Sequence, residues 1–210
     1  MGELVLYNYE LDENCYRVRL VLSVLGLASK LVAINVIPGR EQQSPAMLAL
    51  NPRGQLPILG DGDLVLSGTG AITAYLARRY DETGSLMPID PQAFGQVQMW
   101  LDFAATALKP AYDARLSALF VIGGDQDALT ALARKSLRIM DDFILRRQFT
   151  GAEWFVGDAV TLADLILFPA FALSRDYGIQ HAEFDGLRRW SRRVRSLPGF
   201  KSMPGIPDYQ

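Results

Sequence analysis

Two short stretches of the sequence carry groups that could hold a small peptide. In NPRGQLPIL, residues 51–59, Pro57 stands at the mouth of a predicted strand, where its missing N–H cannot join a sheet ladder. A cis bond between Leu56 and Pro57 would leave the backbone N–H and C=O of Leu56 free to pair with an extended peptide, as an added strand. An ordinary trans proline on an edge strand explains the same residues.

The second stretch is the start of the predicted helix that opens at Thr69. A helix N-terminus offers free N–H groups and the positive end of the helix dipole, which together can bind a carboxylate. A threonine that only caps the helix is the alternative explanation.

The chain is poor in other reactive groups, because its 210 residues include one cysteine, Cys15, and one histidine, His181. This count excludes internal disulfides and zinc sites built from several Cys and His residues, and we expect no bound metal. A Ser–His–Asp or Cys–His mechanism would have to use His181. We expect Cys15 to be a buried, inert thiol and His181 to be a surface or internally paired side chain.

Composition narrows the class of protein. Half of the residues are hydrophobic, and 21 basic residues against 23 acidic ones give a net charge of −2, which is typical of a folded domain and disfavours nucleic-acid binding. The N-terminal residues do not form a signal peptide pattern, and no apolar run is long enough to span a membrane. The sequence therefore predicts a cytoplasmic protein.

The elements that must position these groups fall into two kinds. Up to residue 81 the pattern predicts a βαβ unit followed by ββα, with strands near 4–9, 31–36, 56–59 and 64–67, a helix capped by Asn14, and a helical turn around 45–50. Residues 82–90 are rich in turn formers and predict a linker. Residues 91–210 show only helical periodicity, in which Pro110 should interrupt a helix and Thr161 and Asp164 form a capping box. The predicted fold is an α/β domain followed by an all-α domain.

The order and spacing of these elements along nearly the whole chain resemble the cytosolic glutathione S-transferase family, and in particular its bacterial-type members. The resemblance rests on LYNYELDENCYRVRLVLSVLGL, LALNPRGQLPIL and LSGTGAITAYLARRY in the first domain, and on GDAVTLADLILFP and RSLPGFKSMPG in the second. It implies a thioredoxin-like first domain, an all-helical second domain and a homodimer. It also implies an enzyme that adds glutathione, its co-substrate, to a small hydrophobic electrophile. An isomerase or disulfide reductase that uses glutathione, or a non-catalytic binding protein of the same fold, are the alternatives.

The resemblance assigns glutathione binding to a set of residues in the first domain and one in the second: Arg40, Gln42, Gln43, Gln55, Leu56, Pro57, Gly68, Thr69 and Asp102. Leu56 would pair with the cysteinyl unit, and Thr69 would hold the γ-glutamyl carboxylate. Gly68 stands where the family usually has an acid for the γ-glutamyl ammonium, so the chain departs from the pattern there. Asp102 would come from the partner subunit.

The group that favours the glutathione thiolate stays open at this point. The resemblance offers Tyr7 at a tyrosine-type position, Asn14 or the backbone N–H groups beside it, and Asp12 or Glu13 at a serine-type position. An ionised carboxylate there would repel a thiolate. A second-substrate pocket is expected from aromatic and aliphatic side chains that could equally be core, namely Tyr9, Phe103, Tyr112 and Leu116.

Overall fold

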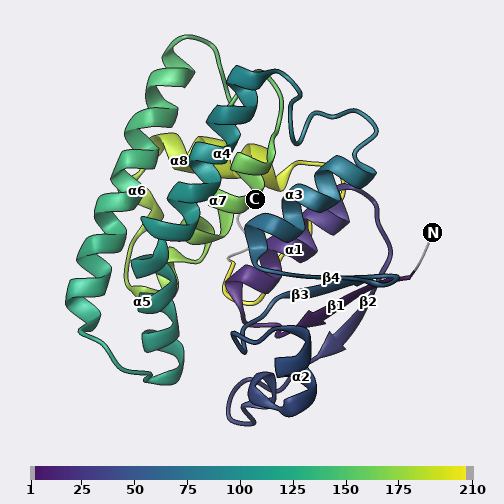
Figure 1. Cartoon of the computed structure of the whole chain (residues 1–210). Helices are drawn as coiled ribbons and strands as arrows, with labels where there is room; N and C mark the ends of the chain where they lie inside the picture. Colours follow the sequence, from purple (N-terminus) through teal and green to yellow (C-terminus); the bar gives the residue numbers. More distant parts are fainter. Residues whose placement is uncertain (1–2, 207–210) are drawn as a thin grey trace.

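The first part of the chain forms a four-stranded sheet between helices (Figure 1). The computed structural model describes residues 3–206. Strand β1 (Leu4–Asn8) runs parallel to β2 (Ser29–Ala33) and antiparallel to β3 (Ile58–Asp61), which pairs with β4 (Leu64–Ser67). The order β2-β1-β3-β4 is the thioredoxin-like arrangement, so the predicted fold class is confirmed for this part.

Helices cover both faces of this sheet. Helices α1 (Glu13–Val24) and α3 (Thr69–Tyr80) lie together on one face, where Leu4 and Leu6 join the main core. The short helix α2 (Pro45–Leu50) lies on the other face, where Met47 and Ile58 are buried in a smaller cluster (Figure 1). Because side chains alternate along a strand, Tyr7 lies on the α2 side with that smaller cluster.

The structure corrects the capping residues of two predicted helices and confirms that the second of these helices begins at Thr69. Helix α1 begins at Glu13 with Asp12 as its N-cap, and Asn14 lies inside the first turn; the Asp12 carboxylate accepts the N–H of Cys15 at 2.7 Å. Helix α3 has Gly68 as its N-cap, so Thr69 is the first helical residue and not the cap. Gly68 has a φ of 90°, a conformation that glycine adopts without the strain of a Cβ.

The second part of the described chain is helical. The predicted interruption near Pro110 is confirmed: helix α4 (Pro91–Thr106) and helix α5 (Lys109–Phe120) are separate, because Pro110 lacks the N–H that a continuous helix needs there. Helix α6 (Gln126–Phe149) packs against α5 and against α8 (Asp185–Arg195). Within residues 3–206 there are three short 3-10 helices: Glu41–Gln43 in the first part, and Ser174–Tyr177 and His181–Glu183 in the second.

Helix α7 (Leu162–Ala172) is the central helix of this part, and all of its residues are buried. The predicted capping box at its start is confirmed: the Asp164 carboxylate accepts the backbone N–H of Thr161 at 2.9 Å. Helix α7 also contacts α1, so it joins the two parts of the molecule.

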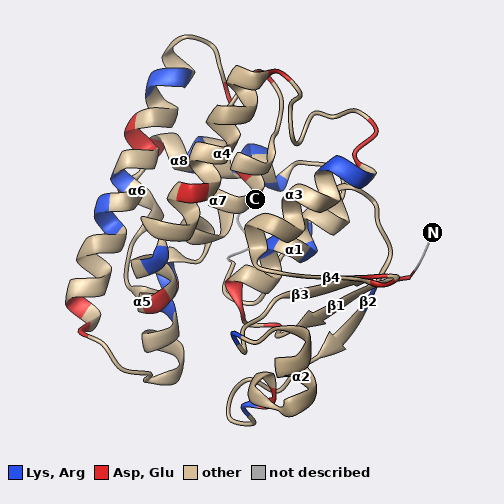
Figure 2. Cartoon of the chain, viewed as in Figure 1, with Lys and Arg blue, Asp and Glu red and all other residues tan. Residues whose placement is uncertain are grey.

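Charged residues of both signs are distributed over helices and loops of both parts (Figure 2). Within residues 3–206, no helix is long and apolar enough to cross a membrane.

Candidate functional site

A cavity of about 550 Å³ opens between the two parts of the molecule. Its walls come from the start of α1, the segment between β2 and α2, the loop before β3, the start of α3, and helices α4, α5 and α7. The residues that line it are Asp12, Asn14, Arg17, Val36, Gln42, Arg53, Gly54, Gln55, Leu56, Gly68, Thr69, Gly70, Ala71, Leu101, Ala104, Ala105, Leu108, Lys109, Tyr112 and Ile166.

The loop before β3 is held by two amide side chains. The buried Asn51 accepts the N–H of Arg53 at 3.1 Å and donates to the carbonyl of Gln55 at 2.7 Å. Gln43 donates to the carbonyl of Gly54 at 3.0 Å. These contacts fix the backbone of the loop and explain its asparagine. Gly54 has a φ of 58°, a left-handed conformation that favours glycine.

The loop ends in a cis peptide bond between Leu56 and Pro57. The β1–β3 register begins at Ile58, so the backbone N–H and C=O of Leu56 lie outside the ladder, at the cavity wall. Beside it, Gln42 also lines the cavity; its Oε1 is buried and has no hydrogen-bond partner among the described residues. The edge therefore presents peptide-like donors and acceptors.

The start of α3 is a second polar wall. Its first intrahelical hydrogen bond runs from Ile72 N–H to the carbonyl of Gly68 at 3.0 Å. The N-cap residue, Gly68, has no side chain that could accept hydrogen bonds from the N–H groups of the first turn. The N–H groups of Thr69, Gly70 and Ala71 precede this bond and belong to residues that line the cavity. An uncapped helix N-terminus of this kind favours an anion.

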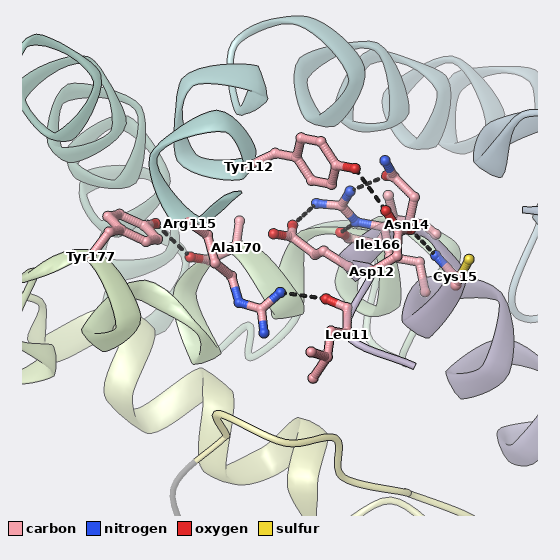
Figure 3. Close-up of polar contacts among 11 residues, drawn as sticks. Leu11, Asp12, Asn14, Cys15, Tyr112, Arg115, Ile166, Ala170 and Tyr177 are labelled. Atoms are coloured by element: carbon pink, nitrogen blue, oxygen red, sulfur yellow. Dashed lines mark hydrogen bonds and ion pairs between the residues drawn. The ribbon is translucent and has the colours of Figure 1, made fainter. Parts of the chain in front are cut away.

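The start of α1 is a third polar wall, and it joins the two domains (Figure 3). Asp12 caps α1 with Oδ1, and its Oδ2 accepts the hydroxyl of Tyr112 from α5 at 2.7 Å. Asn14 Oδ1 accepts Nη1 of Arg17 at 2.6 Å, and Arg17 Nε donates to the carbonyl of Ile166 in α7 at 2.8 Å. The polar groups nearest the start of α1 are therefore fixed by contacts with helices of the second domain.

Two ion pairs, one fully buried and one partly buried, lie behind these residues. Arg17 pairs with Glu13, and both side chains are nearly inaccessible to solvent. Arg115 Nε lies 2.8 Å from Asp176 Oδ2. Figure 3 shows the second contact of Arg115, in which Nη1 donates to the carbonyl of Leu11 at 2.6 Å. Burial raises the pKa of Glu13, and the Arg17 guanidinium opposes that rise. Both arginines are bound within the fold and hold the first turn of α1 in place.

The remaining wall is mostly apolar and comes from the second domain. Its apolar members are Leu101, Ala104 and Ala105 of α4, Leu108, and Ile166 of α7, and Lys109 adds one cation. The exposed Lys109 also forms an ion pair with Asp113. The exposed Arg53 adds a second cation at the opposite loop.

The structure brings part of the predicted site together. The predicted residues that line the cavity are Asp12, Asn14, Gln42, Gln55, Leu56, Gly68, Thr69 and Tyr112. Those that do not line it are Tyr7, Tyr9, Arg40, Gln43, Pro57, Asp102, Phe103 and Leu116. What each residue does for a ligand stays a prediction.

The residues away from the cavity have other contacts. Gln43 supports Gly54, and Phe103 packs on Trp100 with ring centroids 5.2 Å apart. Tyr9 faces Phe120 of α5, with ring centroids 6.5 Å apart. Arg40 and Asp102 are exposed.

Sequence reasoning missed Arg17, Arg53 and Lys109, which line the cavity. Arg53 lies inside NPRGQLPIL, and Lys109 directly precedes Pro110, which interrupts the helix. Both positions therefore lie beside sequence features that could have indicated a place near the site. Arg17 had only its spacing of four residues from Glu13, which favours an ion pair on a helix.

Cys15 and His181, the single cysteine and the single histidine, both have contacts within the fold. Cys15 is buried, Tyr9 N–H donates to its sulfur at 3.5 Å, and burial raises the pKa of its thiol. His181 Nε2 lies 2.9 Å from the carbonyl of Phe171, and its ring stacks on that phenylalanine. The expectations of a buried cysteine and an internally paired histidine are confirmed. No group of three or more His, Cys, Asp or Glu side chains within residues 3–206 is arranged to hold a metal ion.

Two family models match successive parts of the chain. Residues 6–84 match the glutathione S-transferase N-terminal domain, and residues 104–198 match the glutathione S-transferase C-terminal domain. The chain is 31% identical to glutathione S-transferase 3 of Zea mays, with 99% of this chain and 96% of that protein covered. It is 29% identical to maleylacetoacetate isomerase of Rattus norvegicus, with 95% and 91% covered.

Solved structures show the same architecture. Glutathione S-transferase from Pseudomonas fluorescens has a TM-score of 0.86 at 26% identity and covers 97% of this chain and 100% of its own. A glutathione transferase homologue from Lodderomyces elongisporus, solved with two glutathione molecules per subunit, has a TM-score of 0.85 at 24% identity, with 95% and 96% covered.

Proposed function

Because the chain belongs to the glutathione S-transferase family, we propose that it is a glutathione transferase. It binds glutathione in the cavity between its domains, favours the thiolate, and adds the sulfur to a hydrophobic electrophile. One observation carries this proposal: a single cavity joins a backbone edge at Leu56, an uncapped helix start at Thr69 and an amide at Asn14 with an apolar wall.

The three polar walls suit the three parts of the tripeptide. The Thr69 hydroxyl and the N–H groups at the start of α3 together bind the γ-glutamyl carboxylate, since the helix dipole and the free donors both favour an anion. The backbone of Leu56 pairs with the cysteinyl unit as an added strand. Gln42 and Arg53 bind the glycyl end, where the buried Gln42 Oε1 can accept a ligand N–H.

This placement directs the sulfur to the start of α1, between the polar first domain and the apolar wall. Asn14 is the side chain that donates to the thiolate, and the dipole of α1 adds to the effect. Tyr7 lies on the α2 side of the sheet and has no part in this proposal. The electrophile binds against Leu101, Ala104 and Leu108.

Retention on immobilised glutathione tests the binding site. We expect the protein to be retained, Thr69→Val to be retained weakly, and Thr69→Ser, which keeps the hydroxyl, to behave as the unaltered chain. If Thr69→Val is held as firmly as the unaltered chain, the carboxylate is not bound by that residue. A thermal-shift titration separates a binding defect from a folding defect, because a ligand that binds only the native state raises its stability.

The reaction is tested with a chloronitrobenzene, whose conjugation consumes glutathione. A second candidate is glutathione-dependent isomerisation, which the similarity to maleylacetoacetate isomerases favours. That reaction returns glutathione unchanged, so measuring free thiol during turnover distinguishes the two. A chain that binds glutathione but performs neither reaction would be a binding protein of the same fold.

The cytoplasmic location, the homodimer and the part of Asp102 in it stay predictions. Sedimentation of the full chain tests the homodimer.

A further inference from the structure

The hydrogen bond between Tyr112 and Asp12 links the two domains at the cavity, and the proposed binding of glutathione gives it no role. Tyr112 belongs to the second domain and Asp12 to the first, and both side chains line the cavity. The Tyr112 hydroxyl donates to Asp12 Oδ2 at 2.7 Å, at the place where α1 begins (Figure 3).

Both carboxylate oxygens of Asp12 are therefore in use. Oδ1 accepts the N–H of Cys15 at 2.7 Å and caps α1, while Oδ2 accepts the tyrosine hydroxyl. Burial and the negative charge of Asp12 raise the pKa of Tyr112, so its hydroxyl keeps its proton and acts as a donor. The carboxylate is held by one donor from each domain.

A carboxylate at this position opposes the proposed chemistry. A negative charge close to a thiolate raises the pKa of the thiol, and hydrogen bonds that the carboxylate accepts reduce this effect by compensating its charge. Of the other charged groups around it, Glu13 pairs with Arg17 and Arg115 pairs with Asp176. The Arg19 guanidinium also interacts with Asp12, but it donates to Asn8 Oδ1 and to the carbonyl of Glu10 and does not line the cavity. Tyr112 is thus the side chain that compensates Asp12 from the cavity side.

We propose that Tyr112 is a positioning residue of the sulfur site: its hydroxyl, supplied by the second domain, compensates the Asp12 carboxylate and allows a thiolate to form beside an acid. This inference rests on the proposed function, because it needs glutathione sulfur at the start of α1. The helical domain then controls the nucleophile as well as the electrophile.

A double-mutant cycle tests the proposal, with the ultraviolet absorbance of the bound glutathione thiolate measured against pH. Tyr112→Phe keeps the ring and removes the hydroxyl, and we expect it to raise the pKa of the bound thiol by about one unit, a tenfold loss of thiolate near neutral pH. Asp12→Asn keeps a side chain that caps helices well, and we expect it to lower the same pKa. In the Asp12→Asn background, Tyr112→Phe should leave this pKa unchanged.

Tyr75→Phe is the matched control. Tyr75 donates to Asp61 Oδ2, also at 2.7 Å, and neither residue lines the cavity. We expect the thiol pKa of this variant to equal that of the unaltered chain.

The outcomes separate the two proposals. An unaltered chain that binds no glutathione overturns the proposed function and, with it, this inference. If glutathione binds normally but Tyr112→Phe leaves the thiol pKa unchanged, or shifts it equally with and without Asp12, the inference alone is wrong. Equal loss of affinity for glutathione and S-methylglutathione, with an unchanged thiol pKa, would show that Tyr112 only shapes the cavity.

Discussion

Arg17 Nη1 lies 2.6 Å from Asn14 Oδ1, and this contact determines which end of the Asn14 amide is free. A guanidinium only donates hydrogen bonds, so it must face the amide oxygen. The Nδ2 group is then the end of Asn14 that can donate to a ligand in the cavity.

We expect Asn14→Asp to remove this donor while keeping the shape of the side chain. A second carboxylate beside the sulfur should raise the pKa of the bound thiol, so kcat/KM near neutral pH falls about tenfold or more and recovers as the pH rises. The measurement is a pH profile of kcat/KM. A uniform loss at every pH would contradict the assignment of Asn14 to the thiolate.

Lys109 should select electrophiles that carry a carboxylate. Its ion pair with Asp113 is at the surface, where such pairs contribute little, so a substrate anion can replace it. We expect Lys109→Gln to lower kcat/KM about threefold for 4-chloro-3,5-dinitrobenzoate and to leave it unchanged for 1-chloro-2,6-dinitrobenzene.

Lys135→Gln is the control for this comparison, because Lys135 is exposed on α6 and does not line the cavity. Added salt should reduce the preference of the unaltered chain for the benzoate, as expected for an exposed charge. An equal effect of Lys109→Gln on both substrates would contradict the prediction.

Asp164→Ala should be strongly destabilising. The buried carboxylate accepts Phe155 N–H at 3.0 Å and Trp190 Nε1–H at 2.9 Å, in addition to its contacts with Thr161. Its loss leaves several buried donors unpaired, and we expect the free energy of unfolding to fall by about 3 kcal/mol or more. Urea unfolding measures this, with Asp185→Ala as the control, since that side chain is 70% exposed.

His181 should make stability depend on pH. Burial lowers its pKa below the ordinary value of 6.5, so the unfolded chain binds this proton more readily than the folded chain does. Stability is therefore fully present above pH 6.5 and is lost as the pH falls below it. Urea unfolding at pH 7.5 and 5.5 should show a smaller loss for His181→Gln than for the unaltered chain; an equal loss would contradict this assignment.

Much of the fold could be predicted because its signals are local. Pro45 follows Ser44, which caps the helix by accepting Met47 N–H, so a helix over 45–50 was evident. The turn between β3 and β4 is read from GDGD, and the end of α4 from Pro110.

The start of α1 shows where local signals end. Asp12 and Asn14 are both good N-cap residues, so propensity does not choose between them. The structure uses Asp12 as the cap and gives its second oxygen to Tyr112, which lies far away in the sequence. As a result Asn14 does not cap the helix, and its Nδ2 group can donate to a ligand in the cavity.

The position of Tyr7 could have been inferred by alternation. Leu4 and Leu6 point to the face under α1 and α3, so Tyr7 must point to the other face, toward α2. The burial of Arg17 could not have been inferred from the sequence, because an arginine inside a helix is ordinarily at the surface. Its partner, the carbonyl of Ile166, belongs to the other domain.

The bond from Arg17 Nε to the carbonyl of Ile166 also limits how the two halves can be exchanged between relatives. A chimaera that combines this first half with a foreign helical half keeps this bond only where the foreign helix places a backbone carbonyl at the same position; without it, Arg17 and the Asn14 amide that it holds lose a fixed contact. Changes in the helical half can therefore alter acid–base behaviour in the first half without any substitution there, and the two halves are expected to evolve as one unit.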